Sequence, residues 1–98
     1  MVETTKVEGE KDERNVFLYA ISTCGWCKKV KKLLEEMEIE YEYIDIDQVT
    51  GSSYKDIINE LKEYNESATC PTLVIEDGEE VIIGYKEEKI KEAFDVEE

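Results

Sequence analysis

The chain has 98 residues, 41% of them hydrophobic, which is enough for one compact domain with a modest core and too little for two. Acidic residues outnumber basic ones by 26 to 12, and the resulting net charge of −14 argues against nucleic acid or an anionic membrane as a partner. The sequence contains neither the apolar stretch of a secretory signal nor the ~20 apolar residues of a membrane-spanning helix, so we expect a cytoplasmic protein.

The first half of the chain predicts a charged arm, a strand, a helix and a second strand. We expect residues 1–14 to be disordered because they are mostly charged or polar, and residues 15–98 to form the domain. The nearly continuous apolar run over residues 15–21 predicts a central strand that is covered on both faces. Residues 41–46 alternate apolar and acidic side chains, which predicts an edge strand. Between these strands, apolar residues recur with the spacing of one helical face, at Val30, Leu33, Leu34 and Met37.

The second half of the chain predicts a helix, a hairpin and a last short helix. An amphipathic segment with a serine cap ends near Asn65. Two β-rich runs, residues 72–75 and 81–83, flank an Asp-Gly turn signal, and a short helix is expected over residues 87–94. The order βαβαββα predicts an α/β fold with a four-stranded mixed sheet flanked by three helices.

Charge is distributed unevenly along the chain. Residues 15–34 carry four lysines and no acidic residue, whereas residues 35–98 carry five bases and 21 acids. A buried strand followed by a solvated helix face explains the acid-free stretch without any functional role. Alternatively, acidic residues are missing there because a carboxylate beside a thiolate would raise the pKa of that thiol. The sequence alone leaves both interpretations open.

The acid-free stretch contains Cys24 and Cys27, and Cys70 is the third cysteine of the chain. In a reducing compartment, a close Cys-x-x-Cys pair indicates redox chemistry or metal binding. Residues three apart are neighbours on a helical turn, so the two thiols can close a disulfide with little backbone movement. Cys24 would precede the first turn, where the helix dipole favours a thiolate, and Lys28 would add to this stabilisation. Cys27 would be more enclosed and would resolve a mixed disulfide, while Trp26 would present an apolar face to a partner.

Half of a zinc or iron–sulfur site is the competing interpretation of this motif. A closed zinc site requires four nitrogen or sulfur ligands, but the chain has no histidine and only Cys70 as a third thiol. We therefore expect no metal in a monomer. A dimer that shares an iron–sulfur cluster through Cys24 stays open as the alternative.

A proline stands at the entry to a predicted strand, in the stretch Thr69-Cys70-Pro71-Thr72. Pro71 is either an ordinary first-residue proline of that strand or a cis proline.

Three stretches together resemble the active face of a glutaredoxin-type member of the thioredoxin fold: Cys24-Gly25-Trp26-Cys27, Thr69-Cys70-Pro71 and Gly84-Tyr85. The similarity covers about residues 15–94. It implies that Cys24 is the exposed nucleophile, that Cys27 is the resolving thiol, and that Pro71 is cis and faces the disulfide. It also implies that the backbone beside Pro71 pairs with the substrate chain. The implied substrate-binding residues are Trp26, Thr69, Cys70, Pro71, Gly84 and Tyr85.

Two positions depart from the pattern of glutaredoxins that use glutathione. Ile21 stands where those proteins usually have a lysine, and Gly84-Tyr85-Lys86 replaces a Gly-Gly pair followed by an acidic residue. The second stretch is more similar to the redoxins that donate electrons to ribonucleotide reductase and are reduced by a flavoprotein thioredoxin reductase. Strict dependence on glutathione is therefore not expected. Cys70 is interpreted as a half-buried small hydrophobe, with a third redox thiol as the alternative.

The resemblance implies a small thiol–disulfide oxidoreductase that reduces protein or small-molecule disulfides with the Cys24 and Cys27 pair. Its expected partners are disulfide-containing protein substrates and an electron donor, which is either a reductase or a low-molecular-weight thiol. We expect a monomer that needs no bound cofactor. Besides the iron–sulfur alternative, a regulatory adaptor whose disulfide changes its affinity for a partner would carry the same motifs.

Overall fold

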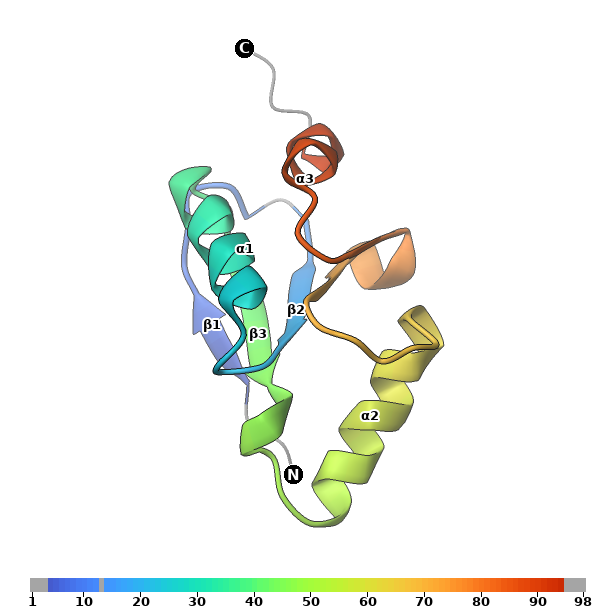
Figure 1. Cartoon of the computed structure of the whole chain (residues 1–98). Coiled ribbons are helices and arrows are strands. Elements are labelled where there is room, and N and C mark those ends of the chain that lie inside the picture. Colours follow the sequence, from blue (N-terminus) through green and yellow to red (C-terminus); the bar gives the residue numbers. More distant parts are fainter. Residues whose placement is uncertain (1–3, 13, 95–98) are drawn as a thin grey trace.

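The computed structural model describes residues 4–12 and 14–94, which form a mixed sheet with helices on both faces (Figure 1). The sheet has five strands in the order β1-β3-β2-β4-β5. The elements in chain order are β1 (Thr5–Val7), β2 (Val16–Ala20), α1 (Gly25–Glu36), β3 (Tyr41–Asp45), η1 (Ile46–Gln48), α2 (Ser52–Tyr64), β4 (Thr72–Ile75), η2 (Glu76–Gly78), β5 (Glu80–Ile83) and α3 (Glu87–Ala93). In the described part of the chain, every helix is too short or too polar to cross a membrane.

The domain follows the predicted order of elements, but one strand position differs: β3 lies between β1 and β2, so it is an inner strand where an edge strand was expected. β2 pairs in parallel with β3, and β4 pairs antiparallel with both β2 and β5. From β2 onward, strands and helices follow in the predicted order βαβαββα. The predicted α/β fold with a mixed sheet and three flanking helices is therefore confirmed.

The predicted arm needs correction over residues 4–12. Thr5–Val7 form β1, which pairs antiparallel with β3, so the sheet has five strands where four were expected. An edge strand is stabilised by backbone pairing and tolerates charged side chains that face solvent, which is why charge alone was misleading here. Val7 packs against the core, and Lys6 forms a salt bridge of 3.1 Å with Glu40. Residues 1–3 and 13 of the predicted arm lie outside the described residues.

The side chains of β2 alternate between two hydrophobic clusters, one on each face of the sheet. Leu18 and Ala20 belong to the cluster formed with α1 and α3, whereas Tyr19 belongs to the cluster formed with α2. Figure 1 shows α1 at left and α2 at lower right, with β2 between them. β2 is thus the central strand that the apolar run predicts. Packing on both faces of the sheet fixes the C-terminal end of this strand, from which the chain turns toward α1.

The register of the strands brings three distant stretches to one edge of the sheet. β2 ends at Ala20, and the following turn leads directly into α1. Thr72, at the start of β4, pairs with Tyr19 of β2 and with Ile83 of β5. The residues that follow β2, precede β4 and follow β5 therefore lie together.

Candidate active site

Cys24 is the N-cap residue of α1. Its Sγ atom accepts a hydrogen bond of 3.2 Å from the backbone N–H of Cys27, and its carbonyl accepts one of 3.1 Å from the N–H of Lys28. A sulfur here takes the place of the side-chain oxygen that usually caps a helix, so it satisfies an N–H group that has no partner inside the helix. An anion at this position also lies at the positive end of the helix dipole.

The Cys24 thiol has a lowered pKa. Burial alone would raise this pKa, but hydrogen bonds from the Cys27 thiol and from the backbone N–H groups of Cys27 and Trp26 together outweigh it. Lys28 is not among the groups that act on this pKa, so its role in stabilising the thiolate stays a prediction. The lowered pKa increases the thiolate fraction of the part-exposed Cys24.

Cys27 differs sharply from Cys24 in environment. It is fully buried in the cluster beneath α1, at 0% exposure. Burial, followed by its hydrogen bond to Cys24, raises the pKa of Cys27 to about 12. Both thiols are free in this structure. The pair thus combines an accessible thiol of lowered pKa with an enclosed thiol that stays protonated.

The turn that leads into Cys24 is anchored by η1. Asp47 accepts hydrogen bonds from the backbone N–H of Ser22 at 2.9 Å and from its hydroxyl at 2.5 Å. Gln48 donates to the same hydroxyl at 3.2 Å. These bonds from Ser22 lower the pKa of Asp47. Sequence analysis did not find Asp47, because its partner lies 25 positions away and no local pattern links the two.

The Cys70–Pro71 peptide bond is cis, as the resemblance implies. The carbonyl of Pro71 accepts a hydrogen bond of 2.8 Å from the N–H of Gly84. This bond ties the proline loop to the residues that follow β5. Among the described residues, no backbone group pairs with the N–H or the carbonyl of Cys70. Pairing of this backbone with a substrate chain stays a prediction.

A buried asparagine organises the proline loop from inside. The Asn65 amide donates to the carbonyl of Thr69 at 3.3 Å, to its hydroxyl at 2.9 Å and to the hydroxyl of Thr72 at 3.1 Å. Its Oδ1 atom accepts from the N–H of Ser67 at 3.1 Å. Sequence analysis predicted Asn65 only as the end of a helix. The buried Asn65 and Thr72, which are 6% and 0% exposed, are therefore supporting residues that the sequence did not reveal.

Two aromatic side chains lie beside the cysteine pair. Trp26 is 58% exposed and stacks on Tyr85 with ring centroids 5.9 Å apart. The Nζ atom of Lys29 lies 5.4 Å from the centroid of the indole ring. The Tyr85 hydroxyl donates to Glu87 at 3.4 Å. An aromatic surface therefore adjoins Cys24 and Cys27, and the role of Trp26 and Tyr85 as substrate contacts stays a prediction.

Cys70 is half-buried and contacts both hydrophobic clusters. Burial raises the pKa of its thiol to about 11, and the negative charges of Cys24, Asp47 and Asp45 act in the same direction. A thiol of this kind stays protonated and reacts slowly, which favours its interpretation as a small hydrophobe.

The structure brings the predicted site residues together from three stretches. The proline loop and the residues after β5 are joined by the bond to Gly84, and Trp26 joins α1 to Tyr85. Thr69 is exposed, and its hydroxyl and carbonyl face Asn65. Within the described ranges, no three His, Cys, Asp or Glu side chains converge as a metal-binding group.

Comparison with known proteins is consistent with this geometry. The glutaredoxin family model matches residues 16–81. A glutaredoxin from Methanosarcina mazei superposes with a TM-score of 0.85 and 34% identity, covering 95% of this chain and 88% of its own. Methanosarcina acetivorans methanoredoxin gives a TM-score of 0.83, 34% identity and 90% coverage of both chains. A glutaredoxin from Archaeoglobus fulgidus gives a TM-score of 0.76 and 32% identity, covering 83% of this chain and 86% of its own.

A comparison with curated protein sequences gave no match. The family match nevertheless spans well over half of the chain, and two of its three cysteines form the Cys-x-x-Cys motif at the start of α1. The chain belongs to the glutaredoxin family.

Proposed function

We propose that this protein is a thiol–disulfide oxidoreductase that reduces disulfides in proteins or small molecules. One observation carries the proposal: Cys24 caps α1 and accepts a hydrogen bond from Cys27, so that a thiol of lowered pKa lies next to a buried thiol of raised pKa. This asymmetry assigns attack to the first thiol and resolution to the second. Family membership supports the same general chemistry.

The reaction proceeds in two exchanges. The Cys24 thiolate attacks one sulfur of the substrate disulfide, which forms a mixed disulfide and releases the other sulfur as a thiolate that takes up a proton. Cys27 then loses its proton and attacks the Cys24 sulfur, which closes the Cys24–Cys27 disulfide and releases the second substrate thiolate. The substrate gains two electrons and the dithiol loses two. An external dithiol or two monothiols must return these electrons for the next turnover.

The proline loop is suited to hold the substrate chain during the first exchange. The N–H and carbonyl of Cys70 lack backbone partners among the residues that the structure describes, and the loop is fixed by Pro71, Gly84 and Asn65. A substrate strand that pairs with this backbone would place its disulfide near Cys24. In this proposal the thiol pair itself carries the electrons, no bound cofactor is required, and the protein acts as a monomer in the reducing cytoplasm.

We further propose that the electron donor is not restricted to glutathione. Ile21 is half-buried and packs against the α2 cluster, so it offers no charge to a tripeptide carboxylate. Glu87, at the start of α3, is paired with Lys91 at 2.9 Å. The decisive comparison measures reduction of the oxidised protein by glutathione and by thioredoxin reductase with NADPH. Fast, saturable reduction by glutathione alone would contradict this part of the proposal.

Substitution of the cysteines tests the two roles separately. Cys24→Ser should abolish reduction of a small model disulfide, because no thiolate remains at the helix N-terminus. Cys27→Ser should retain the first exchange and accumulate the mixed disulfide, which mass spectrometry detects as an adduct on Cys24. Retained multiple turnover in the Cys24→Ser variant would refute the proposed function.

A further inference from the structure

We infer that three exposed lysines on α1, together with the Trp26–Tyr85 stack, form a docking surface for an acidic segment of the partner protein that carries the disulfide. This surface, defined by Lys28, Lys29, Lys32, Trp26 and Tyr85, is called the lysine face below. The inference rests on the proposed function and names the chemistry of its protein substrate.

The charge pattern of α1 opposes its own helix dipole. The helix has no acidic residue in its first turn and no basic residue in its last turn, where Glu35 and Glu36 lie instead. α3 shows the ordinary arrangement, with acids in its first turn and Lys91 in its last. Each misplaced charge near a helix end costs roughly 0.3–1 kcal/mol. At the C-terminal end Glu35 is compensated by a hydrogen bond of 3.0 Å from the Tyr41 hydroxyl, whereas the exposed lysines toward the N-terminal end form no ion pair among the described residues. A local rule broken without such compensation is typical of a functional surface.

The fourth lysine of α1 has a structural role that the other three lack. Lys31 is partly buried, forms a salt bridge of 3.3 Å with Asp45, and lies 3.8 Å from the ring centroid of Tyr43. Lys28, Lys29 and Lys32 are exposed, and none of them meets a carboxylate within 4.0 Å in the part of the chain that the structure describes. Contacts within the fold therefore explain the presence of Lys31, but not that of Lys28, Lys29 and Lys32.

The lowered pKa of Cys24 is accounted for without these lysines. The groups that lower the pKa of Cys24 are the Cys27 thiol and two backbone N–H groups, and no lysine is among them. The lysine face is therefore free to act on a partner that approaches the thiol.

Lys32 is a neighbour of both Lys28 and Lys29 on the helix surface, because it follows them by four and three positions. The three lysines extend over about 6 Å of the helix axis, directly after the turn that carries the cysteine pair. Lys29 also lies over the indole of Trp26, which links the charged part of the lysine face to the aromatic part. A partner segment that covers both parts needs acidic side chains next to an apolar or aromatic one.

The net charge of the protein makes this arrangement selective. With a net charge of −14, most of the surface repels an acidic segment, whereas the lysine face attracts it. A basic partner would bind the acidic surface in many places, but an acidic partner is directed to the one face that adjoins Cys24. Complementary charge of this kind raises the association rate and fixes the orientation of the encounter.

Matched peptide disulfides test the inference. The acidic probe is a disulfide of two peptides in which aspartate, glutamate and phenylalanine flank the cysteine, and the neutral probe replaces the acids with glutamine and asparagine. At ~20 mM ionic strength we expect kcat/KM to be about tenfold higher for the acidic probe, since several exposed charge pairs contribute together. At ~0.5 M salt the ratio should fall below about threefold. Equal kcat/KM for both probes at low salt would overturn the inference.

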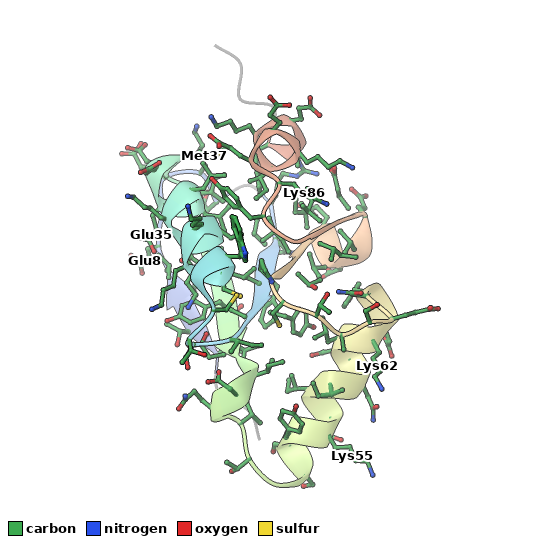
Figure 2. The ribbon with its side chains drawn as sticks, in the orientation of Figure 1. Glu8, Glu35, Met37, Lys55, Lys62 and Lys86 are labelled. Atoms are coloured by element: carbon green, nitrogen blue, oxygen red, sulfur yellow. The ribbon has the colours of Figure 1, made fainter. Side chains whose placement is uncertain are left out.

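Two charge-reversal variants locate the effect. Lys29→Glu with Lys32→Glu should abolish or reverse the preference for the acidic probe. Lys55→Glu with Lys62→Glu makes the same change in net charge on α2, where Figure 2 shows both side chains pointing away from α1, and should retain the preference. An equal loss of preference in both variants would assign the effect to net charge and would overturn the lysine face.

A binding measurement separates this inference from the proposed function. An acidic peptide with serine in place of cysteine cannot react, and its binding should change the fluorescence of Trp26, the only tryptophan of the chain. Binding without reduction of any disulfide would contradict the proposed function and support the lysine face. Reduction of both disulfide probes at equal rates, with no binding of the serine peptide, would retain the function and overturn the lysine face.

Discussion

The Sγ atom of Cys24 lies 3.2 Å from the backbone nitrogen of Cys27, so the Cys24 thiol caps the N-terminus of α1. The Cys27 side chain, in the first turn of the same helix, is fully buried. The capping hydrogen bond, together with the unequal burial of the two residues, gives the two sulfurs different chemistry. Hydrogen bonds stabilise the anionic form of the part-exposed Cys24 thiol. Burial and the adjacent Cys24 favour the protonated form of the Cys27 thiol.

The first prediction concerns selective alkylation. In the folded, reduced protein at pH 7.5, iodoacetamide should modify Cys24 first, because its lowered pKa gives it the larger thiolate fraction. Cys27 and Cys70 have pKa values raised to about 12 and about 11, so they should react at least tenfold more slowly. Peptide mapping by mass spectrometry after short reaction times gives the three rates. The denatured protein is the control, in which all three cysteines should react alike. Equal rates at Cys24 and Cys27 in the folded protein would contradict the assigned roles.

The second prediction concerns stability in alkaline solution. The pKa of Cys70 is raised in the folded state, so folding favours its protonated form. Its stabilising contribution is complete below the unfolded pKa near pH ~9 and is lost as the pH rises toward about 11. The free energy of unfolding should therefore fall more steeply above pH ~9 in the wild type than in Cys70→Ala, by up to about 1 kcal/mol per pH unit. Urea unfolding at several pH values from 7.5 to 10 measures both slopes. Parallel slopes would show that Cys70 has an ordinary pKa.

The third prediction concerns the support of the proline loop. Asn65→Ala removes three donated hydrogen bonds to Thr69 and Thr72, and we expect it to lower the free energy of unfolding by about 1–3 kcal/mol. It should also lower kcat/KM for a peptide disulfide more than for a small disulfide, because only the peptide pairs with the loop backbone. Asn59→Ala, at an exposed position of α2, is the matched control and should change neither quantity. An Asn65→Ala protein with normal stability and normal peptide kinetics would remove Asn65 from the site.

Sequence analysis predicted the central strand, the main helices and the cysteine pair because each has a local signature. Apolar periodicity locates β2 and α1, and the spacing of Cys24 and Cys27 requires only one helical turn. β1 was missed since a short charged strand owes its order to pairing with β3, which no local pattern reveals. For the same reason the supporting bonds of Ser22 to Asp47 were not predicted, because they join separate elements.

The lysines of α1 show a related limit. The acid-free stretch of sequence was compatible with a solvated helix face and with electrostatic support of a thiolate. The structure separates Lys31, which has an intramolecular role, from Lys29 and Lys32, which have no carboxylate partner among the described residues. Sequence spacing places all four on one helix, but only the packing against Asp45 and Tyr43 shows which of them the fold uses.

The fourth prediction concerns the turn before the nucleophile. Asp47 holds this turn through the N–H and hydroxyl of Ser22, so Asp47→Ala should free both groups and loosen the approach to Cys24. The amide of Ser22 should exchange with solvent at least tenfold faster in Asp47→Ala than in the wild type, as measured by hydrogen exchange and NMR. The lowered pKa of Asp47 sets the pH dependence: the carboxylate supports the turn above its unfolded pKa near ~4, and this support is lost as the pH falls through its lower folded pKa. Asp56→Ala on α2 changes the same charge at an exposed position and should leave the exchange of Ser22 unaltered. If Ser22 exchanges equally fast in wild type and Asp47→Ala, η1 does not anchor the nucleophile, and Cys24 is held by the helix cap and by its backbone hydrogen bond of 3.0 Å to the carbonyl of Ile21.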